Sequence, residues 1–469
     1  MMPRRQAHVS PSSLLVVLCA ATFMSSLDLF IVNVALKDIG VNLGETSLAH
    51  LSWILNAYAI VFASLLVPAG RLADRYGNKP LFLFGLGVFS LASLGCAMSG
   101  GLWLIVALRC VQAVGAAALV PTSLGLILTA IPAERRQSSI QIWAVSGSLG
   151  AAAGPALGGL LTHFSWRWIF IINVPVGLAA LIAATLLAPN ITHAIETRVP
   201  DLLGGLVLII AIGALTLALV QGPDWGWGSA STLASFAIST AALAAFIASS
   251  MRHHTPVIDL HFFRNPQFSW ANIAMGLLSV AFAMELLGVV LWLQEGWHWS
   301  AIQTGLSIVP GPAMVSVTAI GLRRYTKNIP AGIVAAIGTL LIGLGGVLIA
   351  ATLTATPSYV AEILPGWMII GAGVGFALPT IVGAGTSTVA AHQTSTASAI
   401  VQMARQIGSA LGVAMLIIIL GPTLASATNL NHFTDAWWWA GGIALAAAIA
   451  ALRITPRHHT AAQPATATN

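Results

Sequence analysis

The chain has 469 residues, of which 57% are hydrophobic and only 7% are charged. Soluble domains are about a quarter charged, so this composition excludes a soluble globular protein. The net charge of +6 is dispersed along the chain and forms no large basic cluster, which argues against nucleic-acid binding.

Apolar runs of about 20 residues, the length that crosses the hydrocarbon core of a bilayer, follow one another along the whole chain. The first run is too long for a signal peptide and has no small-residue cleavage site after it, so we expect an uncleaved first span. We predict fourteen membrane-spanning helices, near 13–36, 50–70, 80–99, 102–125, 139–162, 167–188, 201–221, 230–250, 267–293, 300–322, 329–353, 361–386, 397–421 and 434–453.

The basic residues indicate how these spans are oriented. Most of the 19 Lys and Arg residues lie on alternate connections between spans, whereas the intervening connections carry only Lys37. Connections rich in Lys and Arg stay on the cytoplasmic side of a membrane. We therefore expect a multi-pass protein of the cell inner (plasma) membrane, with both termini, 1–12 and 454–469, in the cytoplasm.

A weak internal repeat divides the spans into two groups. Basic, turn-rich hairpins follow the second predicted span at 70–80 and the tenth at 321–328. Many transporters are built from internal repeats of this kind. The predicted fold is an all-α polytopic membrane protein with two six-helix bundles, 13–188 and 267–453, and an inserted helix pair at 201–250.

Three ionisable residues are predicted at a similar depth inside the apolar spans: Asp28, Arg109 and Glu285. A charge at the centre of a membrane helix costs about 2.5–3.5 kcal/mol on insertion scales, so each needs a partner or a function. Their common depth predicts one cavity between the two bundles. Asp28 and Glu285 would carry protons there while Arg109 tunes their charge; alternatively, Asp28 and Arg109 form a structural tie between helices.

Gln112 lies three residues after Arg109 and therefore shares its helix face. We place a substrate cavity at Asp28, Asn33, Asn56, Gln112 and Glu285. Arg405, in the inner third of its span, either extends toward the cytoplasmic surface or serves transport.

Small residues recur in the fifth predicted span, at Gly150, Gly154 and Gly158, beside Pro155 and Gly159. Such a stripe lets another helix backbone approach closely, and the proline adds a kink. Close packing here would be ordinary helix packing or would also seal a leak path through the protein.

Several of these stretches together resemble the major facilitator superfamily, in its branch of fourteen-span drug:proton antiporters. The hairpin with Gly70, Asp74, Arg75, Gly77 and Lys79 resembles the signature between the second and third spans. The segments 27–36, 109–115, 150–159 and 166–177 resemble motifs of the first, fourth, fifth and sixth spans, and 258–264 and 404–408 fit the same branch. Lys37 departs from the pattern, because the family usually has proline there.

The resemblance implies a secondary transporter rather than an enzyme, and a conformational latch at Gly70, Asp74, Arg75, Gly77 and Lys79. We expect a proton-coupled antiporter that exports amphipathic, including cationic, drugs or natural products by alternating access. The alternatives are an uptake symporter of the same fold and a membrane sensor that transports nothing. The expected partners are a small-molecule substrate, protons and membrane lipid, with no cofactor, no metal and no nucleic acid, and the chain is expected to act as a monomer.

Overall fold

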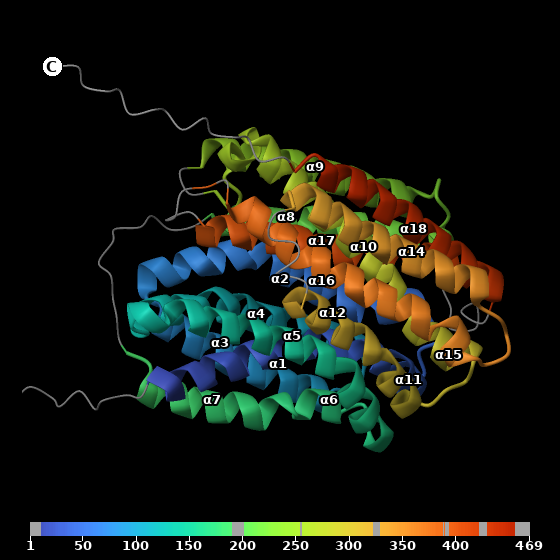
Figure 1. Cartoon of the computed structure of the whole chain (residues 1–469), viewed down its shortest axis with the longest axis horizontal. Coiled ribbons are helices and arrows are strands. Elements are labelled where there is room, and N and C mark those ends of the chain that lie inside the picture. The colour runs from blue at the N-terminus through green and yellow to red at the C-terminus, as the bar shows by residue number, and fades with distance from the viewer. Residues whose placement is uncertain are drawn as a thin grey trace, which may run out of the picture.

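The computed structural model describes residues 11–189, 201–253, 256–321, 329–387, 389, 394–421 and 429–454, and within these ranges the regular structure is helical (Figure 1). The longer helices in the first part of the chain are α1 (Pro11–Leu43), α2 (Leu48–Tyr76), α3 (Asn78–Met98), α4 (Leu102–Ala130), α5 (Ala133–Phe164), α7 (Asn173–Leu187), α8 (Leu202–Trp225) and α9 (Ala230–Arg252). The later ones are α10 (Pro266–Leu291), α11 (Ala301–Ile308), α12 (Pro310–Gly321), α14 (Ala331–Thr352), α16 (Leu364–Thr386), α17 (Thr394–Leu420) and α18 (Leu430–Leu452). Short helices connect them: α6 (Trp168–Ile171), η1 (Leu260–Arg264), the π-helical η2 (Trp292–Gly296) and α15 (Tyr359–Glu362).

Helix packing separates two groups, as the sequence predicts. In the first, α1 packs on α5 and α7, and α4 packs on α2 and α3. In the second, α10 packs on α17 and α18, and α14 packs on α16 and α18. We call α1–α7 the N-terminal half and α10–α18 the C-terminal half. The helices α8 and α9 pack on each other, and α8 also contacts α2 and α17.

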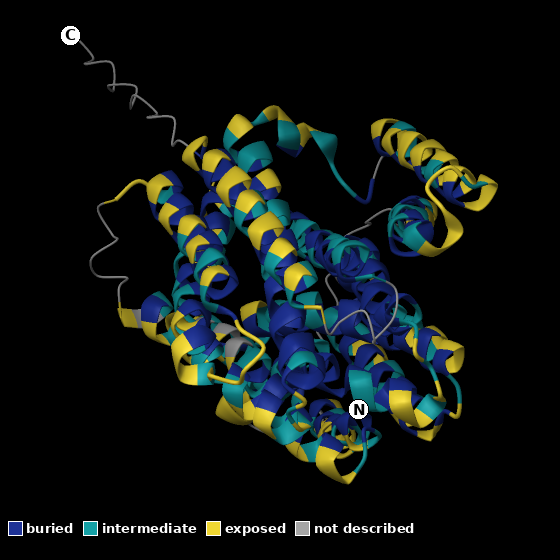
Figure 2. Cartoon of the chain, turned by 90° about the vertical axis from the view of Figure 1, so that its right-hand side faces the viewer, coloured by how far each residue is buried: buried dark blue, intermediate teal, exposed yellow. Residues whose placement is uncertain are grey.

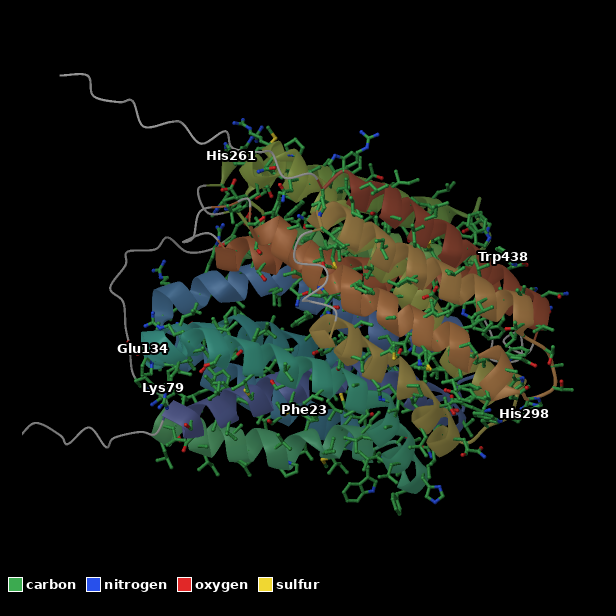
Figure 3. All side chains as sticks on the ribbon, viewed as in Figure 1. Phe23, Lys79, Glu134, His261, His298 and Trp438 are labelled. Carbon is green, nitrogen blue, oxygen red and sulfur yellow. The ribbon has the colours of Figure 1, made fainter. Side chains whose placement is uncertain are left out.

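The described helices run back and forth between two ends of the molecule (Figure 1). We call the end where α1 begins and α18 finishes the terminal end, and the opposite end the far end. Lys79 and Glu134 lie at the terminal end, whereas His298 lies at the far end (Figure 3). Buried residues fill the interior between the helices, and exposed residues follow their outward faces (Figure 2).

Thirteen helical segments among the described residues are long and apolar enough to span a membrane. The tenth predicted span is broken into α11 and α12 at Val309. Pro310 and Pro312 each lack a backbone N–H, so the carbonyl groups four residues earlier lose their helical donors. The carbonyl of Ile308 instead accepts a hydrogen bond from Trp367 Nε1 of α16 at 2.8 Å. The two prolines therefore account for the break, and α16 stabilises it.

Polar contacts join the two halves at the far end. Lys37 of α1 forms an ion pair with Glu295, with 3.2 Å between Nζ and Oε1, and donates a hydrogen bond to the carbonyl of Gln294 at 2.8 Å. The amide of Gln294 donates in return to the carbonyl of Val34 at 2.8 Å. The end of α1 and the π-helical turn η2 are thus held together.

Candidate functional site

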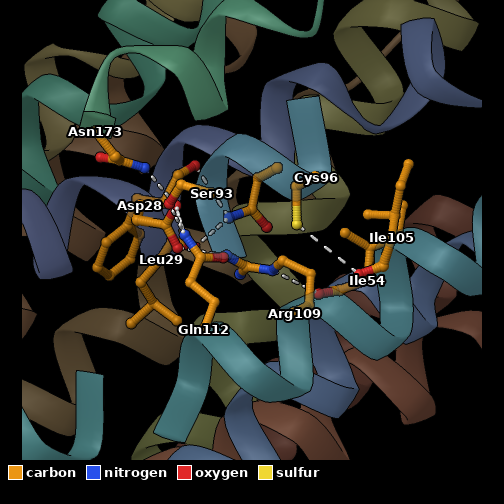
Figure 4. A network of polar contacts seen from close by, with 11 residues as sticks. Asp28, Leu29, Ile54, Ser93, Cys96, Ile105, Arg109, Gln112 and Asn173 are labelled. Atoms are coloured by element: carbon orange, nitrogen blue, oxygen red, sulfur yellow. Dashed lines mark hydrogen bonds and ion pairs between the residues drawn. The ribbon is translucent and has the colours of Figure 1, made fainter. Parts of the chain in front are cut away.

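Asp28 lies at the centre of a buried polar network that joins four helices of the N-terminal half (Figure 4). Its carboxylate forms an ion pair with Arg109 Nη1 of α4. Its Oδ1 accepts hydrogen bonds from Gln112 Nε2 of α4 and from Asn173 Nδ2 of α7, both at 2.9 Å. Gln112 Nε2 also donates to Ser93 Oγ of α3 at 2.7 Å. The spacing of Arg109 and Gln112 along α4 therefore places both on Asp28, as their shared helix face predicts.

Arg109 is held by further contacts with α2. Its Nε donates to the carbonyl of Ile54 at 3.2 Å, and its guanidinium carbon lies 4.0 Å from the centre of the Tyr58 ring. Asp28 and Arg109 are both 0% exposed. A buried ion pair is compensated only when its remaining donors and acceptors are bonded as well, and this network supplies most of those bonds.

Glu285 lies in a different environment from Asp28. It is 0% exposed on α10, where its Oε1 lies close to Gly346 of α14. Neither carboxyl oxygen has a hydrogen-bond partner among the described residues. Asp28 and Arg109 thus lie together in the N-terminal half and Glu285 lies in the C-terminal half, so one cavity shared by the three residues stays a prediction.

The other residues predicted to line the substrate cavity bond within their own helices. Asn33 Nδ2 donates to the carbonyl of Phe30 at 3.1 Å. Asn56 Nδ2 contacts Ser52 Oγ at 3.5 Å, while its Oδ1 is buried without a partner. Both side chains are buried, so a part for them in substrate binding stays a prediction.

The predicted latch forms the turn between α2 and α3. Gly77 has φ 95°, a left-handed conformation that suits glycine, and its N–H donates to the carbonyl of Ala73 at 2.8 Å. Lys79 Nζ donates to the carbonyls of Thr185 and Ala188, at 2.9 and 2.7 Å, which are free acceptors at the end of α7. Gly70 approaches Pro121 of α4, and the Arg75 guanidinium lies 5.4 Å from the Tyr76 ring. The side chain of Asp74 lies outside the described residues.

The glycine stripe of α5 packs directly on α1. A methyl group on Gly150 would overlap the carbonyl of Phe23, and one on Gly158 would lie 2.8 Å from the carbonyl of Ile31. Gly154 lies between them and faces Phe30 and Ile31. The neighbouring Gly159 and Pro155 instead face α11, so this segment contacts both halves of the molecule.

Several residues of these sites were not predicted from the sequence. Ser93, Asn173 and Tyr58 complete the Asp28 network, and Gly305 of α11 faces Gly159. Asn173 could have been found, because it is an isolated amide in a strongly apolar span. Ser93 and Tyr58 carry no comparable signal, since single hydroxyl groups are common in membrane helices.

Arg405 lies near the middle of α17 and is only partly buried. Its Nε is buried without a hydrogen-bond partner. Whether the rest of the side chain extends toward the cytoplasmic surface or serves transport stays a prediction.

Comparisons with known proteins agree over nearly the whole chain. The family model described as Major Facilitator Superfamily matches residues 18–413. A methylenomycin A resistance protein from Streptomyces coelicolor is 31% identical over 417 residues, which cover 88% of this chain and 86% of the relative. A tetracenomycin C resistance and export protein from Streptomyces glaucescens is 33% identical, with 93% and 81% covered, and a cephamycin export protein from Amycolatopsis lactamdurans is 33% identical, with 90% and 88% covered.

Solved structures show the same fold. A peptide transporter described as POT in complex with sulfate has a TM-score of 0.68 at 17% identity, with 96% of both chains covered. A structure described under substrate recognition in proton dependent oligopeptide transporters has a TM-score of 0.67 at 14% identity, with 95% of this chain and 98% of that chain covered.

Proposed function

The chain belongs to the Major Facilitator Superfamily, and from that premise we propose that it exports a small amphipathic molecule in exchange for protons by alternating access. The observation that carries this proposal is its similarity, over most of both chains, to proteins named for antibiotic resistance and export. As a member of this family the protein is a multi-pass membrane transporter rather than an enzyme. We place it in the cell inner membrane, with its terminal end in the cytoplasm, because the basic connections lie at that end.

We propose Asp28 as the group that takes up the coupling proton. Its carboxylate is the only acceptor in the network that is shared by α1, α4 and α7. A proton on Asp28 would remove the charge that holds Arg109 and would replace one acceptor site by a donor. Protonation would therefore loosen α1 from α4 and α7, and α1 is also the helix on which the glycines of α5 pack. Substrate or proton binding shifts the equilibrium between the inward-facing and outward-facing states only if its affinity for the two states differs.

Glu285 is the second proton-carrying candidate. Its oxygen atoms have no hydrogen-bond partner among the described residues, so it could change its charge without breaking a polar contact. The packing of Lys37 on η2 supports the view that this structure is closed at the far end. In the proposed orientation it is the inward-facing state.

The proposal is tested with purified protein in proteoliposomes that carry a pH gradient. Wild type should move a drug against the proton flow, and Asp28→Asn should abolish the dependence on the gradient. Asp435→Asn is the matched control, because it removes an exposed carboxylate at the start of α18. An Asp28→Asn protein that still responds fully to the gradient would show that Asp28 carries no proton.

The same assay separates the alternative functions. An uptake symporter would move protons and substrate in the same direction. A sensor would move neither, and a pump-deleted bacterial host that produces it would gain no protection from drugs. Either result would reject the export proposal.

A further inference from the structure

One face of α17 carries polar residues at helical spacing. Ser398, Gln402, Arg405 and Ser409 follow one another at intervals of three and four residues, so they share one face. All four are partly exposed, although most residues between them on α17 are buried. A partly exposed polar stripe at this depth faces either lipid or an internal space.

The contacts of α17 show which of these it faces. Gly408 and Gly412 pack against α10, where added methyl groups would overlap the backbone. Ala410 packs against Ile60 of α2, and Ile209 of α8 packs against the same cluster. By helical spacing, the polar stripe lies on the side of α17 between its contact with α10 and its contact with α2. Because α10 belongs to the C-terminal half and α2 to the N-terminal half, the stripe faces the boundary between the two halves rather than lipid.

The stripe is partly exposed only along the part of α17 nearer the terminal end. The same face of α17 continues toward the far end with Val413, Leu416 and Leu420, which are buried at 6%, 0% and 0% exposure. Arg405 lies eleven residues after the start of α17, or about 16 Å along the helix at 1.5 Å per residue. The accessible part of the stripe thus ends one turn beyond Arg405.

Arg405 has no partner for its charge in the part of the chain that the structure describes. No hydrogen bond or ion pair to its guanidinium is formed by the described residues, and its Nε is fully enclosed. Gln402 Oε1 is also buried without a partner. The acidic residues at mid-helix, Asp28 and Glu285, are both 0% exposed and present no exposed negative charge beside the stripe. The charge that the stripe presents is therefore positive.

We propose that Arg405, together with the Gln402 amide and the Ser409 hydroxyl, binds the carboxylate of an amphipathic anionic substrate. A guanidinium presents paired N–H donors that match a carboxylate, and a buried N–H donor without a partner is costly. This inference rests on the proposed export function and names its substrate class. It narrows the substrate expected from the sequence, an amphipathic drug or natural product that includes cationic ones, to an anion.

The test uses three probes with one aromatic body and different head groups: 1-naphthylacetate, neutral 1-naphthylacetamide and cationic 1-naphthylmethylammonium. Binding to the purified full chain is measured by equilibrium dialysis in detergent, which requires neither transport nor a pH gradient. Wild type should bind the anion most tightly. Arg405→Gln should weaken binding of the anion by at least about tenfold, the loss typical of a charge-assisted hydrogen bond, and should leave the neutral probe unchanged. Arg405→Lys should keep part of the preference for the anionic probe over the neutral one.

The control is Arg252→Gln, which removes an exposed positive charge from the end of α9 and should change no affinity. Equal binding of the three probes by wild type would overturn the proposal, as would no binding of any probe or an equal loss for all three in Arg405→Gln. If the protein binds the anionic probe selectively but does not export substrate in exchange for protons, the proposed transport function is rejected and the binding site at Arg405 is not.

A second measurement covers the case in which Arg405→Gln does not fold. Ser409→Cys is introduced into a chain whose Cys19, Cys96 and Cys110 are replaced by Ala, and its reaction with N-ethylmaleimide is followed. The anionic probe should slow this reaction, whereas the cationic probe should not. Equal protection by both probes, or protection by neither, would contradict the assignment of the site.

Discussion

Gly159 of α5 and Gly305 of α11 face each other across the two halves of the molecule. The Cα of Gly159 would lie 3.1 Å from a methyl group placed on Gly305, and that group would also overlap the carbonyl of Pro155. A methyl group on Gly159 would in turn overlap the carbonyl of Ala301. The two helices touch backbone to backbone here, which only small residues permit.

Gly305→Ala should therefore separate α5 from α11 and disfavour the state that is closed at the far end. We expect reduced transport together with faster alkylation of a cysteine placed at Ala301. Gly213→Ala is the matched control, because a methyl group at that position of α8 meets no atom within 4 Å. Unchanged alkylation in Gly305→Ala would show that this contact does not hold the far end closed.

Breaking the ion pair between Asp28 and Arg109 should destabilise the N-terminal half. Removing one partner of a buried pair leaves the other charge uncompensated, which typically costs about 3–5 kcal/mol. We expect a marked fall in the unfolding temperature of Arg109→Gln, measured by scanning fluorimetry in detergent. The double variant with Asp28→Asn should lose less than the sum of the single variants, because the two side chains are in contact. Additive losses would mean that the pair contributes nothing to stability.

Glu285→Gln should leave the fold intact, because the carboxyl group makes no hydrogen bond that the amide would lose. If Glu285 carries a proton, the variant should retain substrate binding while its transport responds less steeply to an imposed pH gradient. The measurement is the initial rate of drug transport in proteoliposomes at several gradients. If the transport rate of Glu285→Gln depends on the pH gradient as steeply as that of wild type, Glu285 takes no part in proton coupling.

Reversing the charges of Lys37 and Glu295 tests the closure of the far end. The side chains are 29% and 11% exposed, so the ion pair itself should contribute at most about 1 kcal/mol. Lys37→Glu should favour the open far end, and adding Glu295→Lys should restore part of the closure. The extent of cross-linking between cysteine pairs placed across the far end measures the fraction of molecules that are closed there. A double variant no better closed than Lys37→Glu would show that the charge pair has no part in it.

Lys79→Met should weaken the end of α7. The ammonium group binds two free carbonyls there, and a cation at a helix C-terminus stabilises it by about 0.3–1 kcal/mol. Lys79→Arg keeps the charge and should preserve most of the stability. The measurement is the unfolding temperature, and equal values for the two variants would reject this role for the charge.

Sequence reasoning predicted the local features of this protein better than its tertiary contacts. The apolar runs located the helices, because helix length is fixed by the membrane, and the pairing of Arg109 with Gln112 followed from helical spacing. Depth alone does not identify the neighbours of Glu285, since two residues at one level can face different sides of their helices. The direction in which a helix faces depends on neighbours such as Gly346, which the sequence does not specify.

The break between α11 and α12 was not predicted, although Pro310 and Pro312 were visible in the sequence. Proline is frequent in membrane helices and often causes only a kink. Whether a helix ends there depends on whether another side chain can bind the freed carbonyl, as Trp367 does for Ile308. That partner lies far away along the chain.

The break at Val309 separates one membrane-spanning segment into two helices with different contacts. The short α11 carries Gly305 and its contact with α5, whereas α12 packs mainly on α16 of its own half. A continuous helix would have to tilt as a rigid rod whenever the far end opens. With a pivot at Val309, α11 can move away from α5 while α12 keeps its packing on α16. Opening of the far end therefore need not disturb the packing of the C-terminal half.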